Sequence, residues 1–168
     1  MIFGAKEEII PKYYDDDKPK SAKKTAFGLV RIILLWLWKE TYGGILPAKQ
    51  IEFLVNKYFS AEGLAHYRAL GYEYFKLGQD GVLVVCERET DVYIDKLYLL
   101  PSSRGKGIPE KVFAELAKRG KNLTLNVNQG NERAVHCYRK NGFEVIETAD
   151  ILLDNGMVNK DFVMRKRV

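Results

Sequence analysis

A short basic turn with two glycines is the part of the sequence best suited to bind a charged ligand. It covers residues 104–107 and reads Arg-Gly-Lys-Gly. A run with strand composition precedes it at 91–100, and apolar residues at helical spacing follow from Ile108. Glycines let the backbone bring its N–H groups close to a ligand, and a helix start adds free N–H groups and a partial positive charge. The turn therefore predicts a phosphate or pyrophosphate site.

Two other phosphate-binding motifs do not fit this turn. A dinucleotide fold needs a third glycine and an acidic residue about 20 positions later, in a repeated β-α-β pattern. A P-loop needs Gly-Lys-Ser or Gly-Lys-Thr, which is missing here. On this fragment alone, an exposed connection that uses glycine only for its geometry stays equally open.

A second group of polar residues lies on one face of a predicted helix. Asn131, Ala134 and Tyr138 stand at i, i+3 and i+7. A small alanine between two polar side chains leaves room for a ligand, and a tyrosine hydroxyl can donate a proton. The alternative is a core tyrosine whose hydroxyl bonds a carbonyl, and the helix taken alone favours that alternative.

Two aspartates are candidates for a general base. Asp91 and Asp95 share strand parity, so both can face one cleft. An exposed carboxylate at a strand start is the simpler interpretation of Asp91. His66 and His136 have no partner pattern, and Cys137 is interpreted as a packed small residue.

The composition predicts one α/β domain over residues 1–168. Apolar residues make up 46% of the chain and charged residues 29%, as in soluble globular proteins. Its longest apolar stretch, 29–38, is interrupted by Arg31 and is too short to cross a bilayer. Because the N-terminus lacks the layout of a secretory signal and only two cysteines are present, we expect a cytoplasmic protein without a disulfide framework or a metal site.

The net charge of +5 is concentrated after the glycine turn. From Arg104 to Lys121 there are six basic residues and two acidic ones, which would attract a polyanionic cofactor. Nucleic acid is the competing explanation, but no nucleic-acid motif is present.

The periodicity along the chain predicts the elements that position these residues. Residues 1–24 hold an uncertain first strand within 1–10 and then a mobile connection. Helices are expected at 25–40, from Pro47, from a cap at Ser60 to Ala69, from Ile108, and after a cap at Asn131 with Gly142 at its end. Strands are expected at 72–77, 82–88, 91–100, 123–128, 143–147 and 160–165, the first three as an antiparallel meander.

Two stretches of the chain, 97–108 and 125–143, together resemble the GNAT superfamily of N-acetyltransferases, in its bacterial form. The first corresponds to the family's pyrophosphate loop, Q/R-x-x-G-x-G/A, with Ser102 at the first position of the pattern. The second matches the family's strand-and-helix pattern at Leu125, Val127, Asn131, Ala134, Tyr138, Lys140, Gly142 and Phe143. The resemblance implies an α/β (α+β) fold with a mixed, mostly antiparallel sheet of six to seven strands, helices on both faces, and a splay between the fourth and fifth strands.

The resemblance also implies acetyl-CoA as the cofactor. The residues it places at coenzyme A are Leu97, Tyr98, Leu99, Arg104, Gly105, Lys106, Gly107, Ile108, Pro109, Asn131, Ala134, Tyr138 and Lys140. Among these, Pro109 stands where the family has Gly or Ala, and it removes one N–H donor from the anion site.

The catalytic roles come from the same resemblance. The backbone N–H of Leu99 would polarise the thioester carbonyl, and Tyr138 would protonate the leaving thiolate. Asp91 matches the general-base glutamate of the histone-acetylating branch, and Asp95 lies deeper along the strand, where bacterial members carry an acidic residue. Many members use ordered water in place of a single base.

The C-terminal passage 146–166 resembles the tail of bacterial polyamine acetyltransferases. A small polyamine-like primary amine is therefore the expected acceptor, attracted by Asp91, Asp95, Glu147 and Asp150 if they face the cleft. A protein or peptide amine is one alternative, and a catalytically silent module that binds coenzyme A is another. Neither nucleic acid nor a membrane is expected as a partner, and a homodimer is possible.

Overall fold

The computed structural model describes residues 35–77 and 81–168, apart from 36, 41, 45, 153–155 and 157. The strand predicted within 1–10, the connection up to residue 24 and the start of the helix predicted at 25–40 lie outside the described residues. The end of that helix is present, because residues 37–40 are helical.

The described elements follow the predicted order. They are α2 (Ala48–Phe59), α3 (Ala61–Ala69), β1 (Tyr72–Leu77), β2 (Gly81–Glu87), β3 (Asp91–Leu99), a 3-10 turn (Pro101–Ser103), α4 (Ile108–Ala117), β4 (Asn122–Asn128), α5 (Glu132–Lys140), β5 (Glu144–Leu152) and β6 (Val158–Lys166). They form one six-stranded sheet in the order β1-β2-β3-β4-β6-β5. All neighbours are antiparallel except β3 and β4. The predicted fold class and the β1–β3 meander are confirmed.

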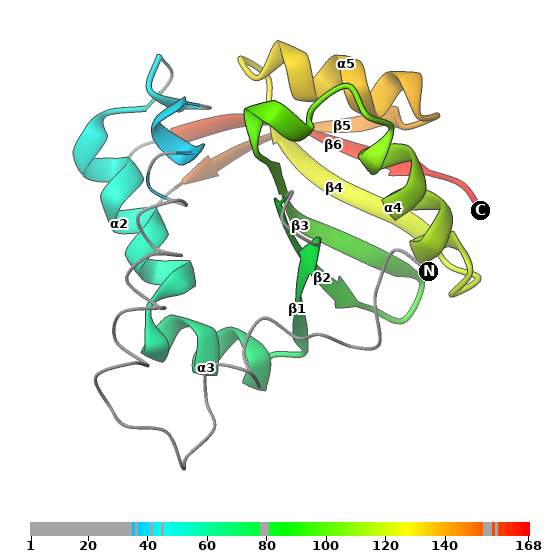
Figure 1. Ribbon diagram of the computed structural model, residues 1–168, viewed down its shortest axis with the longest axis horizontal. Coiled ribbons are helices and arrows are strands. Elements are labelled where there is room, and N and C mark those ends of the chain that lie inside the picture. Colours follow the sequence, from blue (N-terminus) through cyan, green and yellow to red (C-terminus); the bar gives the residue numbers. More distant parts are fainter. Residues whose placement is uncertain are drawn as a thin grey trace.

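The helices lie on the two faces of this sheet and bury two separate cores. One core joins α4 and α5 to the sheet and includes Phe113, Leu125 and Met164. The other joins α2, α3, Tyr42 and Leu46 to β1 and β2, around Trp38 and Val84. Figure 1 shows α2 and α3 together on one side and α4 and α5 on the other.

The sheet splits where β3 and β4 meet. Their parallel pairing covers only residues 91–94 of β3 and 122–125 of β4, although both strands continue beyond it. The two strands therefore diverge toward their carboxyl ends. The predicted splay between the fourth and fifth strands, which counted a strand within 1–10, corresponds to this break between β3 and β4.

A β-bulge in β3 lies at the start of this divergence. Val84 of β2 pairs with Lys96 and the next residue, Val85, pairs with Ile94, so Asp95 is the extra residue. The bulge changes the alternation of the strand. Lys96 therefore shares the α2/α3 face with Val84, and Leu97 packs with the α4/α5 core.

Local capping contacts agree with the sequence. The Ser60 hydroxyl accepts a hydrogen bond from the Gly63 N–H at 3.0 Å, and Asn131 Oδ1 accepts one from the Ala134 N–H at 3.3 Å. Gly142 follows α5 with a φ of 83°, a left-handed conformation that suits glycine. These three predicted helix ends are confirmed.

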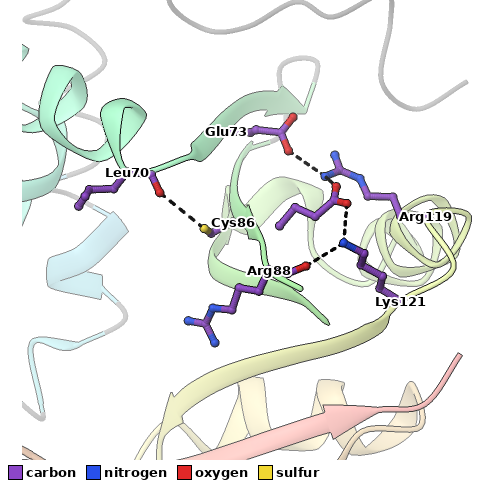
Figure 2. Close-up of polar contacts among 7 residues, drawn as sticks. Leu70, Glu73, Cys86, Arg88, Arg119 and Lys121 are labelled. Carbon is purple, nitrogen blue, oxygen red and sulfur yellow. Dashed lines mark hydrogen bonds and ion pairs between the residues drawn. The ribbon is translucent and has the colours of Figure 1, made fainter. Parts of the chain in front are cut away.

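Charged side chains tie the end of α4 to the β1–β2 hairpin, at the opposite end of the strands from the divergence (Figure 2). Arg119 pairs with Glu73 at 2.8 Å and with Glu87 at 3.1 Å, and Lys121 pairs with Glu87 at 2.9 Å. The Lys121 ammonium also donates to the Arg88 carbonyl oxygen. Two of the basic residues predicted to attract a cofactor are thus neutralised in a structural network.

Two substitutions near the end of α4 separate core packing from this network. Leu116 is fully buried, so Leu116→Ala should lower the free energy of unfolding by about 2–5 kcal/mol. Arg119→Ala removes partly exposed ion pairs and should cost at most about 1 kcal/mol. Urea denaturation followed by circular dichroism measures both, and equal losses would contradict the assignment of stability to the core.

Candidate active site

A cavity of about 380 Å³ opens where β3 and β4 diverge. Four parts of the chain surround it: the carboxyl half of β3, the glycine turn with the first turn of α4, the end of β4, and one face of α5. Tyr42 and Leu37, from the segment before α2, close another side. The predicted phosphate loop and the predicted polar face of α5 therefore line a single cavity.

Two glycines give the turn its shape. Gly105 and Gly107 have φ values of 73° and 70°, and Gly107 is the N-cap of α4. A Cβ on Gly105 would meet nothing within 4 Å, so glycine is required there by backbone conformation and not by lack of space. Pro109 lies in the first turn of α4, where proline is tolerated, and it also lines the cavity.

The edge of β3 beside the cavity is not paired with β4. The ladder between them ends at Ile94 and Leu125, whereas residues 95–99 of β3 continue along the cavity. Unpaired N–H and C=O groups on a strand edge can bond an extended ligand in the manner of an added strand. The open edge and the start of α4 thus offer two sets of backbone donors to one ligand.

Tyr138 reaches the cavity from α5. Its ring packs against Phe113 and Phe143, with ring centroids 6.0 and 5.6 Å away. Burial raises the pKa of the Tyr138 hydroxyl above its ordinary value, so the group stays protonated at neutral pH. The cavity therefore contains a fixed phenol that can serve as a proton donor.

A group of three polar side chains joins both sides of the cavity. Tyr98 and Asn131 interact with the Tyr42 hydroxyl and act on its pKa. Burial raises the pKa of Tyr42 and of Tyr98, which keeps both phenols neutral. Asn131 has a second role, since its Oδ1 caps α5. Sequence reasoning missed Tyr42 as a residue of the site.

A buried ion pair lies at the bulge. Asp95 and Lys96 bond each other, and the Lys96 ammonium lies 3.5 Å from the centroid of the Tyr58 ring. Burial lowers the pKa of Lys96, and the neighbouring Asp95 charge opposes that shift. Both side chains line the cavity. The negative charge that Asp95 was expected to offer a cationic acceptor is thus compensated by Lys96.

Glu40 connects the segment before α2 to the glycine turn and to α5. Its carboxylate oxygens accept hydrogen bonds from the two terminal nitrogens of Arg104, at 2.7 and 2.5 Å. A terminal nitrogen of Arg133 lies 3.5 Å from the same carboxylate. The hydrogen bond from Arg104 is the main reason that the pKa of Glu40 is lowered. Both arginines line the cavity. Arg104 is therefore held by a carboxylate at the place where the sequence predicted that it meets phosphate.

The structure brings most of the predicted site residues together. Of those predicted at the cofactor, all but Lys106 and Ile108 line the cavity: Leu97, Tyr98, Leu99, Arg104, Gly105, Gly107, Pro109, Asn131, Ala134, Tyr138 and Lys140. Asp95 and His136 line it as well, and Asp91 does not. Instead, Asp91 accepts a hydrogen bond from Thr124 and pairs with Arg88 at 3.7 Å.

The remaining carboxylates predicted for the acceptor are elsewhere. Glu147 and Asp150 are exposed on β5, outside the cavity lining. Lys96, Glu110, Asn126 and Arg133 line the cavity and were not predicted. No local motif marks these four residues, because their position depends on the bulge and on the divergence of β3 and β4.

Comparison with known proteins points to one family. The family described as "Acetyltransferase (GNAT) family" matches residues 35–143. The chain is 36% identical over 102 residues to the uncharacterized N-acetyltransferase Rv2669 of Mycobacterium tuberculosis, covering 58% of this chain and 59% of that protein. It is 34% identical over 62 residues to the peptidyl-lysine N-acetyltransferase YjaB of Salmonella typhimurium, covering 37% of this chain and 43% of that protein. The chain thus spans about three fifths, or less, of the length of these curated relatives.

The fold is also found among solved structures. The PaiA N-acetyltransferase of Thermoplasma acidophilum, solved in complex with coenzyme A, superposes with a TM-score of 0.63 at 23% identity, covering 84% of this chain and 92% of that one. At that identity the likeness concerns the fold. Among the helices that the structure describes here, none has the length and apolar character that a bilayer span requires.

Glu40→Gln tests whether Arg104 is available to a phosphate. The substitution removes the charge that holds Arg104 and Arg133, so the Kd for coenzyme A, the cofactor implied by the motifs, should fall about two- to fivefold. Isothermal titration calorimetry measures this, and the gain should shrink with added salt. Glu52→Gln, on the exposed side of α2, is the matched control and should leave the Kd unchanged. Weaker binding by Glu40→Gln would show instead that Glu40 positions Arg104 for the ligand.

Proposed function

This chain belongs to the GNAT acetyltransferase family, and on that basis we propose that it transfers the acetyl group of acetyl-CoA to a primary amine of a small, polyamine-like molecule. One observation carries the proposal: the glycine turn, the open edge of β3 and Tyr138 all line the same cavity. Acetyl-CoA supplies an activated thioester. The residues of this chain hold it, receive the amine and move the protons.

Backbone groups fit the cofactor's two polar regions. In the proposal, the N–H groups of the glycine turn and of the first turn of α4 bind the pyrophosphate, with Arg104 adding charge. Residues 97–99 offer the pantetheine arm a strand edge that β4 leaves unpaired. The N–H of Leu99 is the group assigned to polarise the thioester carbonyl. Pro109 lowers the number of donors in the first turn by one.

The proton transfers are assigned to two side chains. Tyr138 donates to the thiolate as it leaves, because burial keeps its phenol protonated and the residue lines the cavity. Asp95 takes the proton of the incoming ammonium, since it lines the cavity whereas Asp91 is engaged with Thr124 and Arg88. Lys96 then stabilises the Asp95 carboxylate between turnovers.

Acetylation of a peptide lysine is the second candidate function. The relative YjaB is named a peptidyl-lysine N-acetyltransferase, although the match to it covers only 37% of this chain. Both candidates deliver a primary amine to the same thioester, so the acceptor and not the chemistry separates them.

An acceptor panel decides between the candidates. Purified protein is incubated with acetyl-CoA and, in turn, spermidine, spermine, aminoglycosides, amino acids and lysine peptides, and released thiol is measured together with product mass. We expect acetylated polyamine. Labelling of peptides alone would replace the small-molecule proposal with the peptide one. If none of the amines caused thiol release, the result would favour a catalytically silent module that binds coenzyme A.

Tyr138→Phe tests the assigned acid. The variant keeps the ring that packs on Phe113 and Phe143 but loses the hydroxyl, so kcat should fall at least about 100-fold while the Kd for coenzyme A stays within about twofold. Steady-state kinetics and calorimetry supply the two values. Tyr67→Phe removes a hydroxyl from the aromatic cluster outside the cavity lining and is the control. Turnover near that of the wild type would remove Tyr138 from the mechanism.

A further inference from the structure

Asp161 on β6 is a buried carboxylate that the proposed mechanism does not use. Its exposed fraction is 8%, and its Oδ1 has no hydrogen-bond partner in the part of the chain that the structure describes. Leaving a buried charged oxygen without a donor is costly, so such a group needs an explanation. The sequence motif of the C-terminal passage contained Asp161 but assigned it no role.

Asn159, on the same strand, has a second buried side-chain oxygen, Oδ1, without a hydrogen-bond partner among the described residues. Residues two apart on a strand point to the same face, so the Asn159 and Asp161 side chains are neighbours. The pair consists of two acceptors that lack donors, one of them negatively charged. This is the complement of an ammonium group, which has donors and a positive charge and no acceptor.

The register of β6 places this pair on the face of the sheet that α2 and α3 cover. Phe162 and Met164 pack with the α4/α5 core, so Asp161 points to the opposite face. Asp161 pairs with Asn128 of β4, and Asn126, two residues earlier on the same face, lines the cavity. Asp161 and Asn159 themselves lie outside the cavity lining, but Tyr42 lines it and the Asp161 charge acts on the Tyr42 hydroxyl.

The groups around Asp161 do not neutralise it. The adjoining strands present Asn128 from β4 and Ala149 from β5, which carry no charge. The Asp161 charge also acts on Tyr42 and Tyr93, which are neutral phenols, and raises their pKa. Charged groups on this face include Glu147, opposite Val163, and Arg165, which has Glu144 opposite it. Farther along the face are Asp91, bonded to Thr124, and the Asp95–Lys96 ion pair. Burial is the cause that raises the pKa of Asp161, to about 6.

We propose that Asp161, together with Asn159, binds a second ammonium group of the acceptor, so that the favoured substrate is a short diamine or a longer polyamine with one amine at the thioester and another at β6. The proposal rests on the acetyltransferase function above and deepens it. It also differs from the expected acidic set, in which Asp91 and Asp95 are paired and Glu147 and Asp150 are exposed.

A matched pair of substrates tests the role of Asp161. A diamine, 1,5-diaminopentane, is compared with n-pentylamine, which has the same chain length but no second ammonium. We expect the wild type to prefer the diamine about 10-fold or more in kcat/KM, which is the size of a hydrogen bond to a charged group. Asp161→Asn should lose that preference through a higher KM for the diamine, with the values for pentylamine within about twofold of wild type.

The control variant is Asp150→Asn, which removes an exposed carboxylate from β5 and should leave the preference intact. If no amine is acetylated, the proposed function fails. Calorimetric titration of the diamine into protein saturated with coenzyme A then still tests Asp161, by comparing the wild type with Asp161→Asn. Equal preference, or equal binding, in the two proteins would overturn the inference even where transfer is observed.

The stability of the variant separates binding from a structural role. The folded-state pKa of Asp161, about 6, lies above the ordinary value of 3.8, so ionisation of Asp161 lowers the free energy of unfolding. This loss is complete above about pH 6 and disappears as the pH falls below 3.8. Asp161→Asn should therefore have a higher Tm than the wild type at pH 8 and a similar Tm at pH 3.5, measured by thermal denaturation. A lower Tm at pH 8 together with unchanged diamine binding would make Asp161 a structural residue.

Discussion

The structure depends on one interruption of a hydrogen-bonded ladder. β3 and β4 pair only from Asp91 to Ile94, after which the two strands separate. Backbone groups that a continuous sheet would satisfy internally are thereby left beside a cavity of about 380 Å³. Unpaired backbone groups are costly when they are buried away from water, so this edge is suited to a ligand that supplies the missing partners. The separation also brings α5 near the glycine turn, because both flank the same opening.

The bulge at Asp95 decides which charges face that opening. The extra residue turns Lys96 to the face of α2, where it contacts Asp95 and the Tyr58 ring. A buried pair of this kind has little net charge, and two of its neighbours on that face, Tyr42 and Tyr98, are phenols kept neutral by burial. Among the described residues, the interior on the α2/α3 side of the sheet is therefore nearly uncharged, apart from Asp161. A single buried carboxylate has a strong field in such surroundings, because few dipoles and little water screen it.

The sequence predicted most of the fold but only part of the site. Elements with local signals were predictable: Ser60 and Asn131 as caps, Gly142 as a helix end, and the glycine turn before α4. The bulge was not, because it depends on how β2 and β3 align. The shared parity of Asp91 and Asp95 gave no guide to the cleft either, because Asp91 lies in the part of β3 that is paired with β4. Glu40 could not be linked to Arg104 either, since 64 residues separate them and the contact exists only after the two cores assemble. Asp161 stood within the C-terminal passage 146–166, but its burial is a tertiary property.

The two sides of the cavity belong to different cores, and only a few polar contacts join them. Tyr138 packs with the α4/α5 core, whereas Tyr42 and Tyr98 pack with the α2/α3 core. The hydrogen bond from Arg104 to Glu40 and the interaction of Asn131 with Tyr42 connect them. A phosphate at the glycine turn would compete with Glu40 for Arg104, because both are anions that a guanidinium binds in the same geometry. Occupation of the turn thus bears directly on the segment that carries Tyr42. Since the Asp161 charge also acts on Tyr42, this segment links the glycine turn to the face of β6 through residues that neither core alone would hold in place.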